Sequence, residues 1–287
     1  KKNPVDPRLV KLPPYYPDVD PIREDWAAYL ENVQLLDEEV GAILKEFSER
    51  GLLKNTIVFF FSDHGRPFIR AKYWTYDSGI RIPFIVYVPD GVGVVEGYAA
   101  GTTNDQMISS IDITATSLAL AGIAKPSHMQ GKVFLGSNRE EPRELVFSSI
   151  DRISGTYLKT RSVRSKKYKY IKNFNNGRSV LEATTEYAKA HYPCYSAIAI
   201  LDNYNKLTGA EKTLVTPLSL EELYDLENDP EETINLAYDP AYADVRKGLE
   251  KELMSWLEEI DDKGFKPDSP EIQKHFIDTR IRDKERF

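Results

Sequence analysis

The stretch "IVFFFSDHGRPFIRAKYWTYDSGIRIPFIVYVP", residues 57–89, contains the pattern that decides the fold. Its first apolar run ends at Asp63-His64-Gly65, and a second apolar run follows at residues 83–88. Continuous apolar runs of this length are typical of strands covered on both faces by helices. We therefore predict two central strands of a mixed, mostly parallel sheet, joined by a loop rich in basic and aromatic residues.

Helical periodicity flanks these strands. Residues 22–50 carry apolar side chains at spacings of three and four, which predicts a long amphipathic helix capped by Gly51. Residues 112–120 predict another helix, with Asp112 as its N-cap. The sequence thus alternates helix, strand, loop and strand, as an α/β domain does.

The pattern changes beyond about residue 144. Residues 144–150, 157–165 and 167–174 read as short strands, and the last two alternate polar with apolar residues. This predicts a smaller antiparallel sheet, followed by a turn at Asp229-Pro230 and a helix over residues 242–260. We therefore expect one α/β domain over residues 1–143 and an α+β subdomain over residues 144–287, and we assign no structure to residues 181–217.

The composition narrows the class of function. The 287 residues carry 38 Lys and Arg against 45 Asp and Glu, a net charge of -7, which argues against a nucleic-acid binder. Cys194 is the single cysteine, so the chain holds no internal disulfide and no cysteine-based zinc site. No apolar run approaches the ~20 residues of a membrane span, and we expect no membrane partner.

Polar residues gather where the first apolar strand ends. Ligands of open α/β sheets bind at the carboxyl ends of strands, and carboxylate oxygens such as those of Asp63 suit a hard cation. His64 adds a nitrogen ligand or a hydrogen bond, while Arg70 and Lys72 bring positive charge for a sulfate or phosphate. An Asp-x-Gly after a strand is also very often only a turn, so these residues alone leave both interpretations open.

The rest of the stretch resembles the sulfatase family of the alkaline phosphatase superfamily. These enzymes carry a strand ending in Asp-Asn-Gly or Asp-His-Gly, then Lys-x-x-x-x-(Glu/Asp)-x-Gly-Ile-Arg-x-Pro. Residues 72–83 read "KYWTYDSGIRIP" here, and "ELYDLENDPEETINLA" is similar to the family's C-terminal element. The resemblance covers most of residues 22–260 and is greatest to the sulfamidase branch, the N-sulfoglucosamine sulfohydrolases acting on heparan-type sugars.

The resemblance implies a role for several residues. Asp63 and His64 would lie at a divalent metal, usually Ca²⁺, and Lys72 would contact the sulfate as a catalytic residue. Asp77 and Arg81 of the motif would fix the loop. Substrate contacts would come from Lys72, with Arg70, Asp151 and Arg152 as further candidates. Arg66, His191 and Tyr192 are weaker candidates. The alternative role for Arg66 and Arg70 is an exposed, solvated charge, and for Asp151 and Arg152 it is a salt pair within a loop.

Three parts of the family's site are not found in this sequence. No proline has Cys or Ser two residues before it, so the Cys/Ser-x-Pro-x-Arg source of the formylglycine nucleophile is missing. The Asp-Asp metal pair and the Pro-His-x-Pro loop are missing as well. We therefore expect this chain to be a C-terminal portion, whose partner is the missing N-terminal half of the same protein. Alone, the chain should be inactive, bind calcium poorly and leave apolar faces uncovered.

Two other functions remain open. A phosphate or phosphonate ester hydrolase of the same superfamily would also place Asp-His at a metal. A catalytically inactive domain would hold an acidic polysaccharide on the basic strands of residues 161–172. The family resemblance implies export, to a periplasmic, extracellular or lysosomal location.

Overall fold

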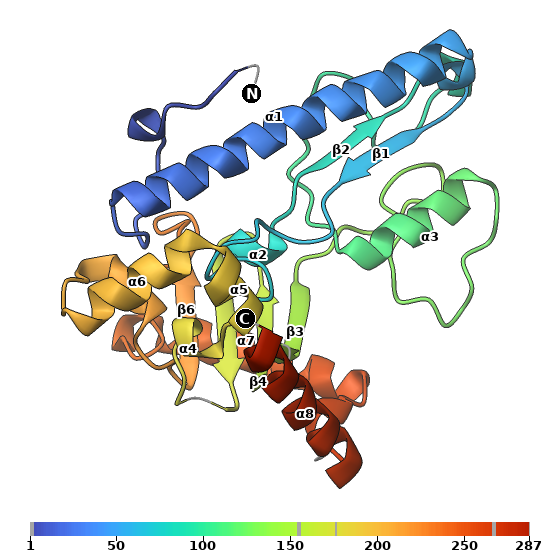
Figure 1. The fold of residues 1–287 in the computed structure, drawn as a ribbon. Helices are drawn as coiled ribbons and strands as arrows, with labels where there is room; N and C mark the ends of the chain where they lie inside the picture. Colours follow the sequence, from blue (N-terminus) through green and yellow to red (C-terminus); the bar gives the residue numbers. More distant parts are fainter. Residues whose placement is uncertain (1–2, 154–155, 176, 266–267, 287) are drawn as a thin grey trace. The chain divides into compact units, whose positions relative to one another are not determined.

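The computed structural model describes residues 3–153, 156–175, 177–265 and 268–286 (Figure 1). Two compact units divide the chain. The first holds residues 1–34, 63–82 and 147–287, and the second holds residues 35–62 and 83–146. The loop between the two apolar strands therefore lies in the first unit, although its neighbours on both sides along the chain lie in the second. The predicted domain boundary at residue 143 stays a prediction.

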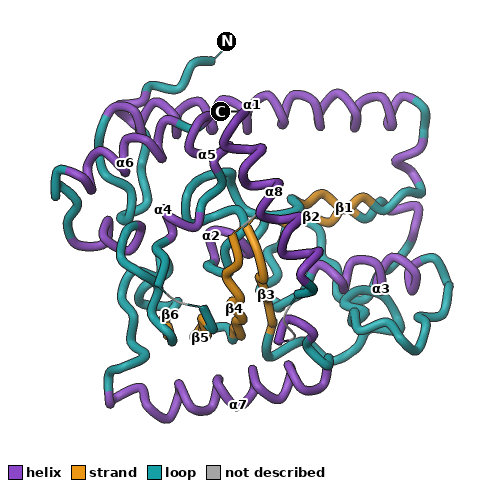
Figure 2. The backbone as a smooth tube through the Cα atoms, turned by 60° about the horizontal axis from the view of Figure 1, so that its bottom comes forward, coloured by secondary structure: helices purple, strands orange, loops and turns teal. Residues whose placement is uncertain are grey.

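A four-stranded sheet in the order β3-β4-β5-β6 organises the first unit. Its strands are β3 (Val146–Ile153), β4 (Thr156–Arg164), β5 (Tyr168–Asn173) and β6 (Glu221–Asp225). The β4–β5 and β5–β6 pairs are antiparallel, which confirms the expected antiparallel sheet. Helix α7 (Ala243–Glu259) runs beneath β4 and β5 and contacts both, as the predicted terminal helix should (Figure 2).

Short helices fill the stretch that the sequence left unassigned. They are α4 (Val180–Ala183), α5 (Glu186–His191) and α6 (Pro193–Asn203). Local capping explains the starts of α4 and α6: Ser179 and Glu182 form a capping box, and Pro193 occupies the first turn of α6. A further helix, α8 (Pro270–Arg286), follows α7. The 3₁₀ turns are η1 (Pro7–Leu9), η2 (Leu52–Lys54), η3 (Asp90–Val92), η4 (Gly209–Leu214), η5 (Pro240–Tyr242) and η6 (Lys263–Phe265).

The core of the first unit draws on segments far apart in the sequence. The N-terminal segment contributes Tyr15 and Tyr16, which are 0% and 3% exposed, and the first half of helix α1 (Asp20–Glu49) contributes Trp26. Phe68 and Trp74, from the loop between the apolar strands, pack into the same core. The aromatic residues of that loop are therefore packing residues, and they fix its basic residues onto a rigid base.

The second unit contains the two apolar strands, β1 (Val58–Phe61) and β2 (Phe84–Tyr87). They pair antiparallel, with Phe59 opposite Val86. The mostly parallel arrangement expected from the sequence is therefore wrong for these two strands, although the mixed α/β class is confirmed. An apolar run indicates that both faces of a strand are suited to burial but carries no information about strand direction.

Two helices flank this strand pair. The second half of α1 (Asp20–Glu49) and α3 (Ser110–Leu120) lie on opposite sides of β1 and β2 (Figure 1). Gly51 follows α1 with a left-handed φ of 72°, so the predicted cap is confirmed. The predicted N-cap of α3 is three residues late: Ser109 is the cap, and Asp112 accepts the Ser109 N–H at 2.8 Å as the third residue of a capping box.

Apolar side chains of the second unit are widely exposed. Leu35 and Ile43 of α1 are 57% and 53% exposed, and Ile85 of β2 is 59% exposed. We call this set the exposed apolar group: Leu35, Leu36, Ile43, Leu44, Phe61, Ile85 and Tyr87. The expectation of uncovered apolar faces is thus confirmed. Among the described helices, including the 30 residues of α1, none has the length and apolar content to cross a membrane.

Candidate functional site

The Asp-His-Gly turn follows directly on β1. The Asp63 side chain is 81% exposed and the His64 side chain 34% exposed, and Asp63 Oδ2 lies 3.2 Å from His64 Nε2. The ring nitrogen Nδ1 of His64 lies 2.7 Å from the carbonyl oxygen of Gly65. Both predicted metal ligands therefore lie together at the surface of the first unit.

The carbonyl contact assigns the tautomer of His64. A carbonyl oxygen only accepts, so Nδ1 carries a hydrogen, and a lone pair on Nε2 would face the Asp63 carboxylate favourably only with a cation or a proton between the two atoms. Metal-binding histidines commonly donate their second ring N–H to a backbone carbonyl in this way. A carboxylate oxygen and an imidazole lone pair this close together are the donor types that a divalent cation accepts.

These two donors are only part of a ligand set. The described residues contain no group of three or more His, Cys, Asp or Glu side chains that could hold a metal ion. Calcium takes about 6–8 oxygen ligands. The Asp-His-Gly turn therefore fits a divalent cation in the type of its donors, but two donors do not make a complete calcium site.

Two glycines hold this turn against α2 (Asp77–Ile80). The Gly65 N–H donates to the Gly79 carbonyl at 2.8 Å, and a Cβ on Gly65 would lie 1.9 Å from the Ser78 carbonyl oxygen. A Cβ on Gly79 would lie 2.2 Å and 2.3 Å from the carbonyl oxygens of Ala71 and Trp74. Only glycine fits at either position, because backbone atoms occupy the space.

We call residues 66–76 the lysine loop. Lys72 is half-buried, and its N–H donates to the Arg66 carbonyl at 3.0 Å. Its neighbours Arg70 and Tyr73 have positive φ values of 63° and 77°, which cost about 1–3 kcal/mol each for a non-glycine residue. Nothing in the described part of the chain places a carboxylate in an ion pair with Lys72, so its ammonium group remains suited to an anion.

Arg70 is buried and makes its contacts within the first unit. Its guanidinium is buried, lies 3.8 Å from the centre of the Tyr76 ring, and donates to the carbonyl oxygens of Glu231 and Glu232. The alternative of an exposed, solvated charge is therefore wrong for Arg70. As a substrate contact Arg70 stays a prediction that this burial does not favour.

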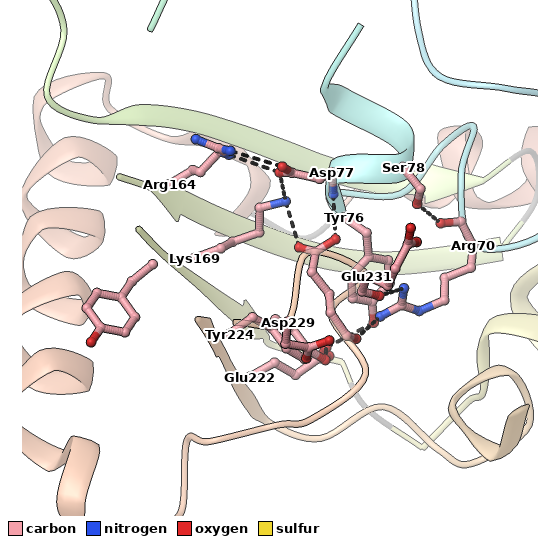
Figure 3. A network of polar contacts seen from close by, with 12 residues as sticks. Arg70, Tyr76, Asp77, Ser78, Arg164, Lys169, Glu222, Tyr224, Asp229 and Glu231 are labelled. Carbon is pink, nitrogen blue, oxygen red and sulfur yellow. Dashed lines mark hydrogen bonds and ion pairs between the residues drawn. The ribbon is translucent and has the colours of Figure 1, made fainter. Parts of the chain in front are cut away.

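Asp77, at the start of α2, is the centre of a buried charge cluster. Arg164 donates to both of its carboxylate oxygens at 3.0 Å, and Lys169 Nζ lies 2.5 Å from Oδ1 (Figure 3). Burial opposes ionisation, but the Lys169 charge and hydrogen bonds from both cations outweigh it and lower the pKa of Asp77 to about 2. Asp77 therefore fixes the loop, as the motif implied.

Two further basic residues of strands β4 and β5, Arg161 and Lys172, are also paired. Arg161 is 1% exposed and binds Asp151 and Asp262 at 2.7 Å each, while Lys172 pairs with Glu250. With Arg164 and Lys169 bound to Asp77, these cations are neutralised within the chain. The basic strands therefore offer little support for the alternative of a polysaccharide-binding face.

Asp151 and Arg152 belong to β3, not to a loop after it. The sequence predicted a strand that ends at residue 150, but β3 continues three residues further, to Ile153. Arg152 pairs with Asp268 and lies 4.2 Å from the centre of the Phe276 ring of α8. Arg152 therefore binds the C-terminal segment of the first unit, whereas Asp151 pairs with Arg161 of β4. Their predicted substrate contacts stay predictions.

Two of the weaker candidates, His191 and Tyr192, lie at the end of α5 and directly after it. His191 stacks on Tyr187 with ring centres 4.1 Å apart, and its Nδ1 lies 2.9 Å from the Tyr187 carbonyl. Cys194 is fully buried, and burial raises the pKa of its thiol, as expected of an incidental thiol and not of a nucleophile.

Sequence reasoning missed the role of Glu232, which is 1% exposed and accepts the Asp77 N–H at 2.6 Å. Its signal was its place in "DPEET" beside the predicted turn, but the turn alone did not indicate its partner.

Two family sequence patterns match this chain. The pattern described as "Sulfatase" matches residues 9–123, and the pattern "N-sulphoglucosamine sulphohydrolase, C-terminal" matches residues 68–182. An ulvan-active sulfatase of Formosa agariphila is 33% identical over 92% of this chain and 43% of its own length. The human N-sulphoglucosamine sulphohydrolase is 29% identical over 90% and 52%. The chain thus spans about half the length of these curated relatives.

Solved structures agree with the fold. A 2-O GAG sulfatase has a TM-score of 0.61 at 22% identity, over 84% of this chain and 44% of its own. A protein solved with its substrate D-glucosamine-2-N,6-O-disulfate has a TM-score of 0.60 at 21% identity, over 84% and 42%. Identities this low bear on the fold alone.

Proposed function

Because this chain is a relative of the sulfatases that matches the C-terminal portion of their length, we propose that it is part of a hydrolase that removes sulfate from a sulfated sugar. The observation that carries the proposal is the packing of Asp63-His64-Gly65 and the lysine loop against the same short helix, α2. The Asp63 carboxylate, the His64 imidazole and a lysine with no carboxylate ion pair among the described residues thus share one support, which favours the proposal.

The residues of this chain have separate tasks in such a reaction. Asp63 and His64 would hold a divalent cation, Ca²⁺ by family resemblance, which when bound supplies a Lewis acid for the sulfate oxygens. Lys72 binds the sulfate group and stabilises the negative charge that grows on its oxygens during hydrolysis. The α2 packing holds Lys72 in place before the substrate arrives, so little reorganisation is needed.

The nucleophile comes from outside these residues. The chain contains no Cys/Ser-x-Pro-x-Arg, so we place a formylglycine and further metal ligands in an N-terminal half of the same protein. That half would also cover the exposed apolar group, whose side chains are 37–59% exposed. The same resemblance supports an exported protein and a substrate of the heparan-type class, including N-sulfated glucosamine.

The first experiment compares two forms of the protein. This chain alone and the longer protein with its N-terminal half are assayed on an aryl sulfate and on N-sulfoglucosamine. We expect turnover by the longer protein and none by the chain alone. Turnover by the chain alone would show that the nucleophile lies within it and would contradict the proposal.

The second experiment removes Lys72. In the longer protein, Lys72→Ala is expected to lower kcat/KM about 10²–10³-fold, because one charge-stabilising donor is lost. Lys206→Ala is the matched control, since Lys206 is exposed in the same unit. Equal activity of the two variants would remove Lys72 from the site.

The third experiment measures metal binding by calorimetry. We expect the chain alone to bind Ca²⁺ with a Kd weaker than about 1 mM, because two donors cannot replace the ligands of a full site. The longer protein should bind one ion tightly and lose it in the Asp63→Asn variant. Retention of the ion by that variant would move the metal site elsewhere.

The phosphate or phosphonate ester hydrolase remains the second candidate, because Lys72 and a divalent cation would bind either anion. A phosphate ester assayed beside the aryl sulfate distinguishes them, and a higher kcat/KM for the phosphate ester would favour the second candidate.

A further inference from the structure

Glu232 joins three segments of the first unit. Its Oε2 accepts the N–H of Asp77 at 2.6 Å, at the start of α2. Its Oε1 lies 2.7 Å from Lys169 Nζ on β5, and the Lys169 side chain is fully buried. The backbone carbonyls of Glu231 and Glu232 accept from Arg70, so the turn that carries Glu232 also holds the lysine loop.

The turn itself is fixed by local hydrogen bonds. Asp229 accepts the N–H groups of Thr233 and Ile234 at 2.7 Å and 2.8 Å. Glu232 has a φ of 56°, in the left-handed region that non-glycine residues rarely occupy. An unfavourable backbone conformation persists where the surrounding contacts determine it, and here those contacts direct the Glu232 carboxylate at α2.

In the sequence, Lys72 lies between Arg70 and Asp77, the two residues that are hydrogen-bonded to the turn of Glu232. Arg70 precedes Lys72 and is bound through its guanidinium, while Asp77 follows and is bound through its N–H. The loop between them contains the left-handed residues Arg70 and Tyr73, so it would relax if either attachment were lost. Gly79 of α2 in turn accepts the Gly65 N–H, which extends the same support to the Asp-His-Gly turn.

Stability alone is a poor reason for such a cluster. Buried charges lose their hydration, and replacing a buried ion pair by apolar side chains of similar size is often neutral or stabilising. The hydrogen bond that Glu232 Oε2 accepts from the Asp77 N–H is instead directional, and Oε1 adds an ion pair with Lys169. Such contacts determine where α2 and the lysine loop lie.

We propose that Glu232 is a positioning residue, which acts through Asp77 and Arg70 to hold Lys72 and the Asp-His-Gly turn in their places. The assignment of Lys72 to the sulfate rests on the proposed function, whereas the positioning of the loop by Glu232 does not. The two are therefore tested separately.

The first test is hydrogen exchange on this chain. Glu232→Gln keeps the size of the side chain but removes its charge, and we expect amide exchange in residues 63–79 to become about tenfold faster or more. Exchange in α7 of the same unit should not change. The control is Glu227→Gln, because Glu227 is exposed and pairs only with Lys167 among the described residues. Unchanged exchange in residues 63–79 would overturn the proposal.

A double variant separates positioning from general stability. Glu232→Met with Lys169→Met replaces the pair by apolar side chains, so no lysine charge stays buried without Glu232. We expect overall stability close to that of the parent, with exchange in residues 63–79 still fast because the Asp77 N–H has lost its acceptor. Slow exchange in the double variant would show that Glu232 only neutralises Lys169, and would also overturn the proposal.

The kinetic test uses the longer protein and an aryl sulfate. Glu232→Gln should lower kcat about tenfold or more with a smaller change in KM, since the loop is misplaced but not removed, and Glu232→Asp should restore part of the loss. An unchanged kcat with fast loop exchange would reject the link to catalysis. If the parent protein hydrolyses no sulfate ester, the proposed function fails while hydrogen exchange still decides the role of Glu232.

Discussion

Replacing Asp77 by Asn removes one carboxylate charge from the buried cluster and leaves the side-chain size nearly unchanged. The substitution leaves Lys169, which is fully buried, with Glu232 as its remaining carboxylate partner. Arg164 loses both of its hydrogen bonds to a carboxylate, and its side chain is only 18% exposed. We therefore expect Asp77→Asn to destabilise the first unit.

The magnitude follows from the pKa of Asp77. A pKa of about 2 in place of 3.8 corresponds to about 2 kcal/mol in favour of the ionised carboxylate, at about 1.4 kcal/mol for each pH unit. Removing one partner of a buried ion pair costs about 3–5 kcal/mol when the charge left behind has no other partner. Because Lys169 keeps Glu232, we expect a loss of about 2–3 kcal/mol at pH 7.

Urea denaturation followed by tryptophan fluorescence measures this loss, because Trp26 and Trp74 lie in the core of the same unit. The control is Asp202→Asn, an exposed aspartate of α6 that should change the free energy of unfolding by less than about 0.5 kcal/mol. Equal stability of the Asp77 and Asp202 variants would refute the reasoning, because the cluster would then contribute nothing beyond an exposed charge.

Four further predictions concern the same carboxylate and three other parts of the chain. The Asp77 carboxylate stabilises the fold above pH ~4, and this contribution should be lost as the pH falls toward about 2. Acid titration followed by circular dichroism should show this loss of stability in the parent and not in Asp77→Asn. Gly79→Ala should lower the free energy of unfolding in urea by more than about 3 kcal/mol, since the new Cβ would lie 2.2 Å from a backbone oxygen. Gly41→Ala is the control, because a Cβ at this exposed position of α1 would meet nothing within 4 Å and should stabilise by up to about 1 kcal/mol. A similar effect of both substitutions would contradict the tight packing of α2. Cys194 should react with a thiol reagent at least about 100-fold faster in denaturant than in the native chain, because its thiol is buried and burial raises its pKa; rapid native labelling would contradict this burial. Leu36→Lys should reduce concentration-dependent association of this chain in ultracentrifugation without lowering its stability, and unchanged association would show that the exposed apolar group does not cause it.

The sequence predicted well those elements whose signals are local. Periodicity located α1 and α7, and alternation located β4 and β5 within a few residues. The Asp-His-Gly turn was predicted because a polar triplet ends an apolar run, and the cap at Gly51 because glycine tolerates a left-handed backbone. Each of these signals lies within a few residues of the feature that it determines.

Features that depend on distant partners could not be predicted. The antiparallel direction of β1 and β2 leaves no trace in their apolar runs. Arg70 and Lys72 looked alike as basic loop residues, but Arg70 is buried because Tyr76 and the carbonyls of a turn about 160 residues away surround it. The three-residue shift at the start of α3 has a local cause, since Asp is common both as N-cap and as the third residue of a capping box.

The attachment of the lysine loop to Glu232 also sets an order of events during synthesis. The bond from Asp77 to Glu232 spans 155 residues, which a ribosome adds in about 8–30 s at about 5–20 residues per second. Throughout that time the loop has none of its C-terminal contacts and its buried aromatic residues lack part of their cover. The loop should therefore become protected from proteases only after residue 232 has emerged, and a stop codon before residue 232 should leave it permanently cleavable.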